Sequence, residues 1–226
     1  MTLILAIPAT DGLIVASDSQ ITTGEVRTPG QKIHRLNDRC LWAGAGELAL
    51  VQRVGEHFGA LPQDAHLANL RDQLAAVIKQ CVTELTQLDF RLQFLPPDPE
   101  RLLQLHYADF IFAELGREPE LLHISSLGSP EWFQNQPMVV GSGDLFAYAL
   151  LQKYQGRSLT PEKAAILAYK VIEETIEVGA YGLGPPIDVW QITRAGVKRL
   201  GEEELTDLAV AAHELREKEI QLLIAG

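Results

Sequence analysis

The second residue of the chain carries a hydroxyl group that could act as a nucleophile. Thr2 follows Met1 and opens the apolar run Leu3–Ile7. Threonine is small enough for the usual removal of an initiator methionine, which would leave one residue with both a free α-amine and a hydroxyl. A free α-amine has a pKa of roughly 7.7–8.0, so it can accept the hydroxyl proton near neutral pH. The sequence therefore predicts a nucleophile whose own amine is the base.

Three further residues have the chemistry to support Thr2. A lysine cation at Lys32 would favour the neutral amine, because like charges disfavour each other, and Asp18 would hold that lysine protonated. Gly46 could present its backbone N–H to a developing oxyanion, since glycine permits a close approach. Together these groups predict acyl transfer, in which an amide is hydrolysed through an acyl-enzyme on Thr2.

Each of these residues also has a simpler interpretation. Thr2 could be an ordinary second residue, Asp18 a turn residue and Lys32 a solvated loop residue. Ser142 lies between two glycines in a predicted strand-to-helix turn, where capping the helix competes evenly with a role in a site. Its glycines do not have the nucleophile-elbow spacing, and the stretch 44–46 lacks the Gly-Lys-Ser/Thr of a phosphate loop.

Composition limits the classes of function. The chain has 226 residues, which fits one domain or a tight pair, and a net charge of −11 from 19 basic and 30 acidic residues. That charge argues against binding to nucleic acid, which needs a basic face. We expect no membrane partner, because no stretch is long enough to cross a bilayer, and a cytoplasmic location, because no signal peptide is visible. The six histidines and two cysteines form no metal-binding motif, so we expect neither a metal nor a cofactor.

Hydrophobic periodicity predicts strand-rich blocks that alternate with helices. This order does not match a βαβ repeat and favours packed sheets with helix pairs outside. A Pro-rich stretch at 95–100 is expected to be a long loop. The expected strands are 2–9, 13–17, 33–36, 41–45, 108–115, 121–125, 138–140, 187–193 and 197–200, and the expected helices are 47–58, 67–88, 144–154, 161–178 and 202–223.

Short motifs in a fixed order resemble those of the proteasome β-subunit family, in the class of N-terminal-nucleophile (Ntn) hydrolases. They are Thr2, Asp11-Gly12, Ala16-Ser17-Asp18-Ser19-Gln20 with Thr22 and Gly24, Lys32-Ile33-His34-Arg35-Leu36, Gly44-Ala45-Gly46, and Gly141-Ser142-Gly143 with Phe146-Ala147-Tyr148. The chain is similar to the bacterial members, the HslV peptidase and the bacterial proteasome-like subunits. The resemblance covers nearly the whole chain. It implies an α+β fold, with residues 1–226 as a single domain in a four-layer αββα sandwich of two antiparallel sheets flanked by helix pairs.

The resemblance also implies roles for individual residues. Thr2 matches the nucleophile, and Asp18 matches the acidic residue that pairs with the active-site lysine, Lys32. Gly46 matches the glycine whose backbone N–H forms the oxyanion hole, and Ser142 matches the serine near the N-terminal amine. The implied protein is a threonine endopeptidase in a homo-oligomeric, stacked ring that cleaves peptides or unfolded proteins. An ATP-dependent unfoldase is the implied partner.

One stretch departs from the family pattern and keeps two alternatives open. Where family members carry Asp-Ala-Tyr-Ser-Gly-Gly, this chain has Gly179-Ala180-Tyr181-Gly182-Leu183-Gly184. The aspartate and serine that organise the threonine amine are thus replaced by glycines, and Glu177 or Asp188 would have to substitute. A weakly active or inactive ring scaffold is therefore one alternative. A small-molecule amidase on the same fold is the other, with an apolar pocket suggested by Ile21 and Leu48.

Overall fold

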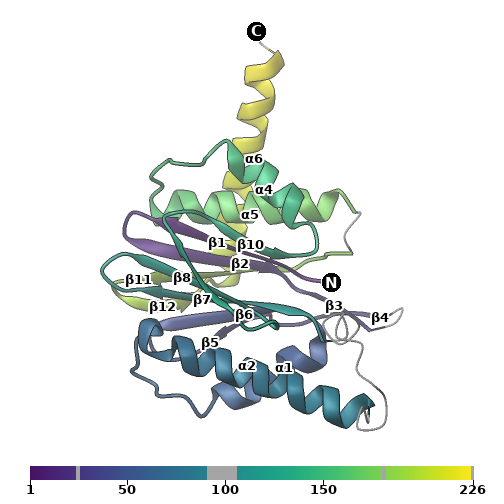
Figure 1. The fold of residues 1–226 in the computed structure, drawn as a ribbon. Coiled ribbons are helices and arrows are strands. Elements are labelled where there is room, and N and C mark those ends of the chain that lie inside the picture. Colours follow the sequence, from purple (N-terminus) through teal and green to yellow (C-terminus); the bar gives the residue numbers. More distant parts are fainter. Residues whose placement is uncertain (24–25, 91–105, 180–181, 225–226) are drawn as a thin grey trace.

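Two antiparallel sheets lie face to face between layers of helices (Figure 1). The computed structural model describes residues 1–23, 26–90, 106–179 and 182–224. The first sheet has the strand order β10 (Met138–Gly141), β1 (Leu3–Ala9), β2 (Gly12–Asp18), β11 (Ile187–Thr193) and β12 (Gly196–Arg199). The second sheet has the order β5 (Ile33–Arg35), β6 (Cys40–Gly46), β7 (Ala108–Leu115), β8 (Pro119–Ser125) and β9 (Pro130–Gln134).

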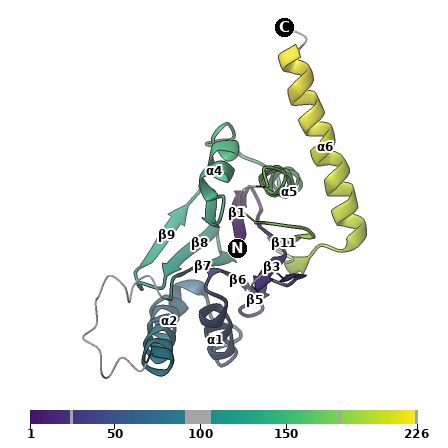
Figure 2. The same cartoon turned by 90° about the vertical axis from the view of Figure 1, so that its right-hand side faces the viewer.

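The helices cover the outer faces of the sheets. Helices α4 (Asp144–Gln152) and α5 (Pro161–Glu177) lie on the first sheet, and α1 (Leu48–Phe58) and α2 (Leu67–Phe90) lie on the second. Helix α6 (Glu202–Ile224) packs on α5, and its C-terminal end projects away from the rest of the protein (Figure 2). The α+β class and the four-layer arrangement expected from the sequence are confirmed.

Strand β1 shows why the sequence specifies these layers. Successive side chains of a strand point to opposite faces of the sheet. Leu3, Leu5 and Ile7 pack in the cluster beneath α5, whereas Ile4 and Ala6 pack in the cluster between the two sheets. Because both faces are covered, the strand is apolar at almost every position rather than at alternate ones.

Three strands were not expected from the sequence. Strands β3 (Gln20–Thr23) and β4 (Val26–Pro29) pair as a separate two-stranded ribbon, and β9 lies at the edge of the second sheet. All of β4 is exposed and β9 is mostly so, so neither carries the apolar pattern of a core strand. The loop expected at 95–100 lies outside the described residues, as do Gly24, Ala180 and Tyr181.

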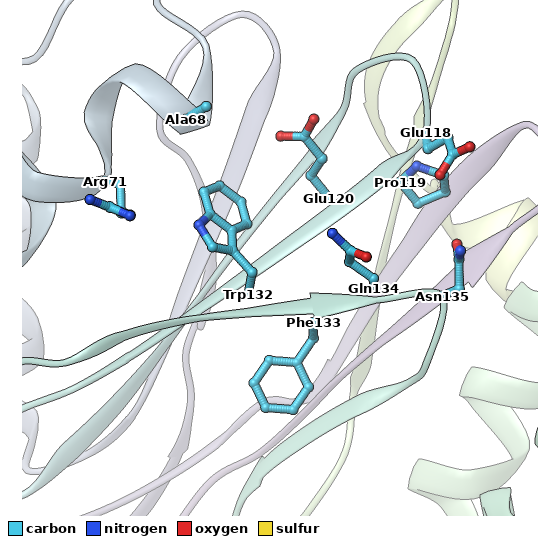
Figure 3. A pocket seen from close by; sticks show the side chains of 9 residues that line it. All are labelled: Ala68, Arg71, Glu118, Pro119, Glu120, Trp132, Phe133, Gln134 and Asn135. Atoms are coloured by element: carbon cyan, nitrogen blue, oxygen red, sulfur yellow. The ribbon is translucent and has the colours of Figure 1, made fainter.

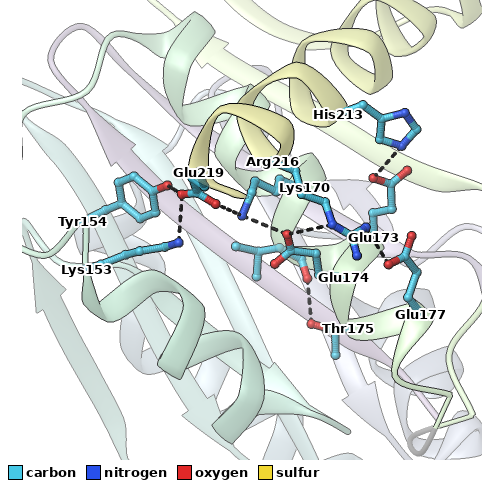
Figure 4. A network of polar contacts seen from close by, with 11 residues as sticks. Lys153, Tyr154, Lys170, Glu173, Glu174, Thr175, Glu177, His213, Arg216 and Glu219 are labelled. Atoms are coloured by element: carbon cyan, nitrogen blue, oxygen red, sulfur yellow. Dashed lines mark hydrogen bonds and ion pairs between the residues drawn. The ribbon is translucent and has the colours of Figure 1, made fainter. Parts of the chain in front are cut away.

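Polar contacts attach α6 to α5 (Figure 4). The ammonium group of Lys170 is 2% exposed and lies 2.9 Å from a carboxylate oxygen of Glu174 and 2.9 Å from one of Glu219. Tyr154 donates a hydrogen bond of 2.6 Å to Glu219, and Lys153 contacts the same oxygen at 2.8 Å. Burying a lysine cation is costly unless it is paired, and the carboxylates from the two helices supply that pairing.

The pKa of Glu219 makes this attachment sensitive to acid. Burial raises its pKa, but the hydrogen bonds from Lys153, Tyr154 and Lys170 outweigh burial and lower the pKa to about 2. A carboxyl group whose pKa is lowered in the folded state stabilises that state at pH values above its ordinary pKa, near 4.5. This stabilisation is lost as the pH falls through about 2. We therefore expect wild type to unfold at higher urea than Glu219→Gln near pH 6, and the difference to shrink towards zero between pH 4.5 and pH 2. A difference that stays constant across that range would contradict the assignment.

The packing beneath α5 gives a second prediction. Leu5 is 0% exposed, whereas Leu145 on α4 is 81% exposed. Leu5→Ala should lower the free energy of unfolding by about 2–5 kcal/mol, through lost burial and the cavity left behind. The matched Leu145→Ala should change it by less than about 0.5 kcal/mol. Urea unfolding followed by circular dichroism measures both, and equal effects would contradict the assigned burial.

Candidate active site

The carboxylate of Asp18 is the centre of the candidate site. It lies at the end of β2 and is completely buried. Its Oδ1 accepts hydrogen bonds from the backbone N–H of Leu3 at 2.9 Å and from Nζ of Lys32 at 2.7 Å. Its Oδ2 accepts from the backbone N–H groups of Gln20 at 3.1 Å and Gly184 at 3.2 Å. One side chain therefore fixes β1, the start of β3, the segment before β5 and the segment before β11.

The side chain of Lys32 links Asp18 to the peptide bond between Met1 and Thr2. Its Nζ also donates to the carbonyl oxygen of Met1 at 3.1 Å, and the residue is 6% exposed. The Met1 carbonyl belongs to the peptide bond whose nitrogen is that of Thr2, so the Lys32 ammonium group lies beside that nitrogen. Burial lowers the pKa of Lys32, and the charge of Asp18 opposes this shift only in part. The site therefore holds a shielded cation next to the group expected to act as base.

Backbone contacts hold Thr2 from the opposite side. Its carbonyl oxygen accepts a hydrogen bond of 2.7 Å from the backbone N–H of Ser142. Gly141 has φ +102°, and a Cβ there would lie 2.0 Å from the Thr2 carbonyl oxygen and 3.2 Å from Cβ of Ala45. Only glycine fits at 141. Ala45, near the end of β6, therefore lies close to Gly141.

Gly46 follows Ala45 at the end of β6, and its surroundings also leave no room for a side chain. Its φ is +148°, and a Cβ there would lie 2.3 Å from the carbonyl oxygen of Tyr107 and 2.5 Å from Cα of Ala108. The structure thus brings Thr2 together with Asp18, Lys32 and Ser142, and Gly46 lies one residue beyond Ala45 at the end of β6.

Ser142 does not cap helix α4. The N-cap of α4 is Gly143, with φ 85° and no side-chain cap hydrogen bond. The interpretation of Ser142 as a helix cap is therefore wrong. Its described contact with Thr2 is made by its backbone N–H, which the residue type alone could not predict.

The two glycines that replace the family's aspartate and serine contribute only backbone atoms to this chain. The carbonyl oxygen of Gly182 accepts a hydrogen bond of 2.7 Å from the side-chain amide of Gln20. A Cβ on Gly182 would lie 2.4 Å from Cε of Met1, so the Met1 side chain occupies the space above this glycine. Gly179 and Gly182 both have positive φ, of 69° and 61°.

The two acidic residues considered as substitutes are engaged elsewhere. Glu177 forms an ion pair of 2.7 Å with Arg216 and is about half exposed. Asp188 accepts from Arg199 at 2.8 Å and from the indole N–H of Trp190 at 3.1 Å. Neither carboxylate is recorded in contact with Thr2 or Lys32, so the expectation that one of them orders the amine is not supported by the described residues.

Sequence reasoning missed the backbone donors of the site. The N–H groups of Leu3, Gln20 and Gly184 had no signal in the sequence, because every residue except proline carries one. The buried hydroxyl of Ser17, next to Asp18, was also missed, and it has no hydrogen-bond partner among the described residues.

Other features of the described residues lie apart from this site. A surface pocket of about 420 Å³ between α2 and the β8–β9 hairpin is lined by none of the residues of the candidate site (Figure 3). Within the described ranges, no three histidine, cysteine, aspartate or glutamate residues come together as a metal site. No described helix is both long and apolar enough to cross a membrane.

Comparisons with known proteins identify chains of similar sequence. The family model described as "Proteasome subunit" matches residues 2–95. Proteasome subunit beta of Methanocaldococcus vulcanius is 26% identical over 203 residues, which cover 88% of this chain and 84% of the relative. Proteasome subunit beta of Nanoarchaeum equitans is 27% identical over 203 residues, which cover 88% of this chain and 97% of the relative.

Solved structures share the whole fold. Anbu (ancestral beta-subunit) from Yersinia bercovieri superposes with a TM-score of 0.74 at 15% identity, covering 98% of this chain and 96% of that one. An Anbu mutant from Hyphomicrobium sp. strain MC1 superposes with a TM-score of 0.70 at 17% identity, covering 98% and 97%. These identities show the fold alone. The family match and the related β-subunits thus support the resemblance to the proteasome β-subunit family, and the chain has the Ntn-hydrolase fold.

Proposed function

We propose that the protein is an N-terminal threonine peptidase that hydrolyses peptide bonds through an acyl-enzyme on Thr2. The observation that carries this proposal is the buried Lys32–Asp18 pair, whose ammonium group lies beside the Thr2 nitrogen. A salt bridge this deeply buried is weak evidence for stability, because desolvation offsets the attraction between the charges. Its position next to a hydroxyl-bearing residue favours a chemical role instead.

The proposed reaction begins after Met1 is removed. While Met1 is present, the Thr2 nitrogen is an amide and cannot accept a proton. Once free, the amine takes the hydroxyl proton as Oγ of Thr2 attacks the substrate carbonyl, and the Gly46 N–H stabilises the oxyanion. The amine then donates the proton to the leaving nitrogen, which leaves an ester on Thr2. Water hydrolyses that ester and returns the hydroxyl.

The wider setting is part of the same proposal. Residues 1–226 act as one domain, in a cytoplasmic homo-oligomeric ring that receives peptides or unfolded protein, with an ATP-dependent unfoldase as partner. The similarity to proteasome β-subunits and to Anbu supports this setting.

A second candidate is a non-catalytic scaffold on the same fold. It is favoured by Gly179 and Gly182, together with the engagement of Glu177 and Asp188 in other contacts. A covalent inhibitor directed at N-terminal threonine separates the two candidates when combined with intact mass measurement. Protein that lacks Met1 and gains one adduct per chain supports the peptidase. Processed protein that gains no adduct and cleaves no peptide supports the scaffold.

Substitution of the nucleophile gives the most direct prediction. Thr2→Ala should reduce peptide cleavage by at least about 10⁴-fold, because no other group can form the acyl-enzyme. Thr2→Ser should retain measurable cleavage, since it keeps both the hydroxyl and the amine. Thr206→Ala, on the exposed surface of α6, is the matched control and should cleave at the wild-type rate. Cleavage of a fluorogenic peptide by mass-verified protein without Met1 measures all three.

The Lys32–Asp18 pair gives a prediction that separates catalysis from stability. Lys32→Met should abolish cleavage and lower the free energy of unfolding by about 3–5 kcal/mol, because Asp18 is left buried without its cation. The double variant Lys32→Met/Asp18→Asn removes the unpaired charge but sets an amide NH₂ against backbone N–H donors, so it should recover only part of that stability and no activity. The control Arg53→Met breaks a half-exposed ion pair with Glu84 and should change stability by less than about 1 kcal/mol. Recovery of activity in the double variant would contradict a chemical role for Lys32.

A further inference from the structure

The side chain of Met1 packs on the backbone of Gly182, beside the candidate site. The three atoms nearest to a Cβ built on Gly182 are Cε, Sδ and Cγ of Met1, and all three lie within 3.9 Å of it. The linear end of the methionine side chain therefore lies along this glycine. Met1 is 60% exposed, and the rest of its surface is covered. The space that this side chain fills is here called the Met1 seat, and Gly182 is its floor.

Hydrogen bonds hold the floor of the Met1 seat in place. The carbonyl oxygen of Gly182 accepts from the side-chain amide of Gln20 at 2.7 Å. Two residues further on, Gly184 donates its N–H to Asp18 at 3.2 Å and accepts from the N–H of Ser19 at 3.1 Å. The floor is thus tied to the carboxylate at the centre of the candidate site. We therefore expect the seat to keep its shape after Met1 is removed.

The proposed reaction brings the substrate to this space. Removal of Met1 empties the seat and frees the amine of Thr2. That amine donates a proton to the leaving nitrogen of the substrate, so the two nitrogens must approach to hydrogen-bond distance, about 3 Å. The carbonyl carbon of Met1 is bonded to the same Thr2 nitrogen before removal. The first residue after the scissile bond is therefore the part of the substrate that starts closest to the emptied seat.

We propose that the Met1 seat binds the side chain of the first residue after the scissile bond, and that it favours an apolar, unbranched side chain such as that of methionine. This inference rests on the proposed peptidase reaction. Gly182 is the specificity-determining residue, because any side chain at this position would enter the seat. Its φ of 61° lies in the left-handed region that favours glycine, so the backbone conformation and the open seat require the same residue.

Three peptides that differ only in the first residue after the scissile bond test the seat. That residue is methionine, glycine or aspartate. Mass-verified protein without Met1 is given each peptide, and mass spectrometry identifies the products. Wild type should cleave the methionine peptide with a kcat/KM at least about fivefold higher than either of the others, since one fully enclosed methylene is worth roughly tenfold and this side chain is only partly enclosed.

Variants at two glycines separate the seat from backbone strain. Gly182→Ala places a methyl group in the seat and should remove the preference for methionine over glycine. Gly179→Ala is the matched control, because its φ of 69° is similar but the nearest atom to a Cβ there is 3.9 Å away. It should keep the wild-type preference. Circular dichroism checks that both variants are folded.

The outcomes distinguish this inference from the peptidase proposal. Wild type that cleaves all three peptides equally well, or that cleaves the aspartate peptide as well as the methionine peptide, overturns the inference and leaves the peptidase proposal in place. Folded Gly182→Ala protein that keeps the methionine preference also overturns it. Wild type that cleaves none of the peptides overturns both proposals. The wild-type comparison requires no variant, so it decides the matter even if Gly182→Ala folds poorly.

Discussion

The buried carboxylate of Asp18 is the interaction on which the site depends. It accepts hydrogen bonds from the backbone N–H groups of Leu3, Gln20 and Gly184. It also accepts one from the ammonium group of Lys32. Each bond satisfies a group that would otherwise be costly to bury. Leu3 follows Thr2 directly in the chain. The carboxylate that pairs with Lys32 therefore also helps to fix the position of Thr2. Charge compensation and positioning are therefore performed by the same four hydrogen bonds.

Much of the fold could be predicted from the sequence, because buried elements carry a strong pattern. Strand β1 is apolar on both faces, and helix α5 begins at Pro161, as expected, with Thr160 as its N-cap. The ribbon of β3 and β4 could not be predicted, since its pairing leaves β4 exposed and without an apolar face. Asp18 and Lys32 could be singled out because they match motifs of the family, and the structure pairs their side chains. The donors at Leu3 and Ser142 could not, because a backbone N–H is common to nearly every residue.

Helices α5 and α6 are held in place by different forces. Beneath α5, the contact with the sheet is made by interdigitated aliphatic side chains. Between α5 and α6, the buried Lys170 sits among carboxylates from both helices. Aliphatic packing is insensitive to pH, whereas the polar contact depends on Glu219 remaining ionised. The sheets and α5 thus form the more robust part, and α6 is the part whose attachment responds to its surroundings.

The positions of the chain ends have a practical consequence for anyone producing the protein. The N-terminus lies among the sheets at the site, whereas α6 carries the C-terminus away from them (Figure 1). An affinity tag ahead of Thr2 would leave its nitrogen as an amide, so a tagged preparation would look inactive whatever the native protein does. A tag at the other end would follow α6, away from the site. Recombinant protein therefore needs its tag at the C-terminus.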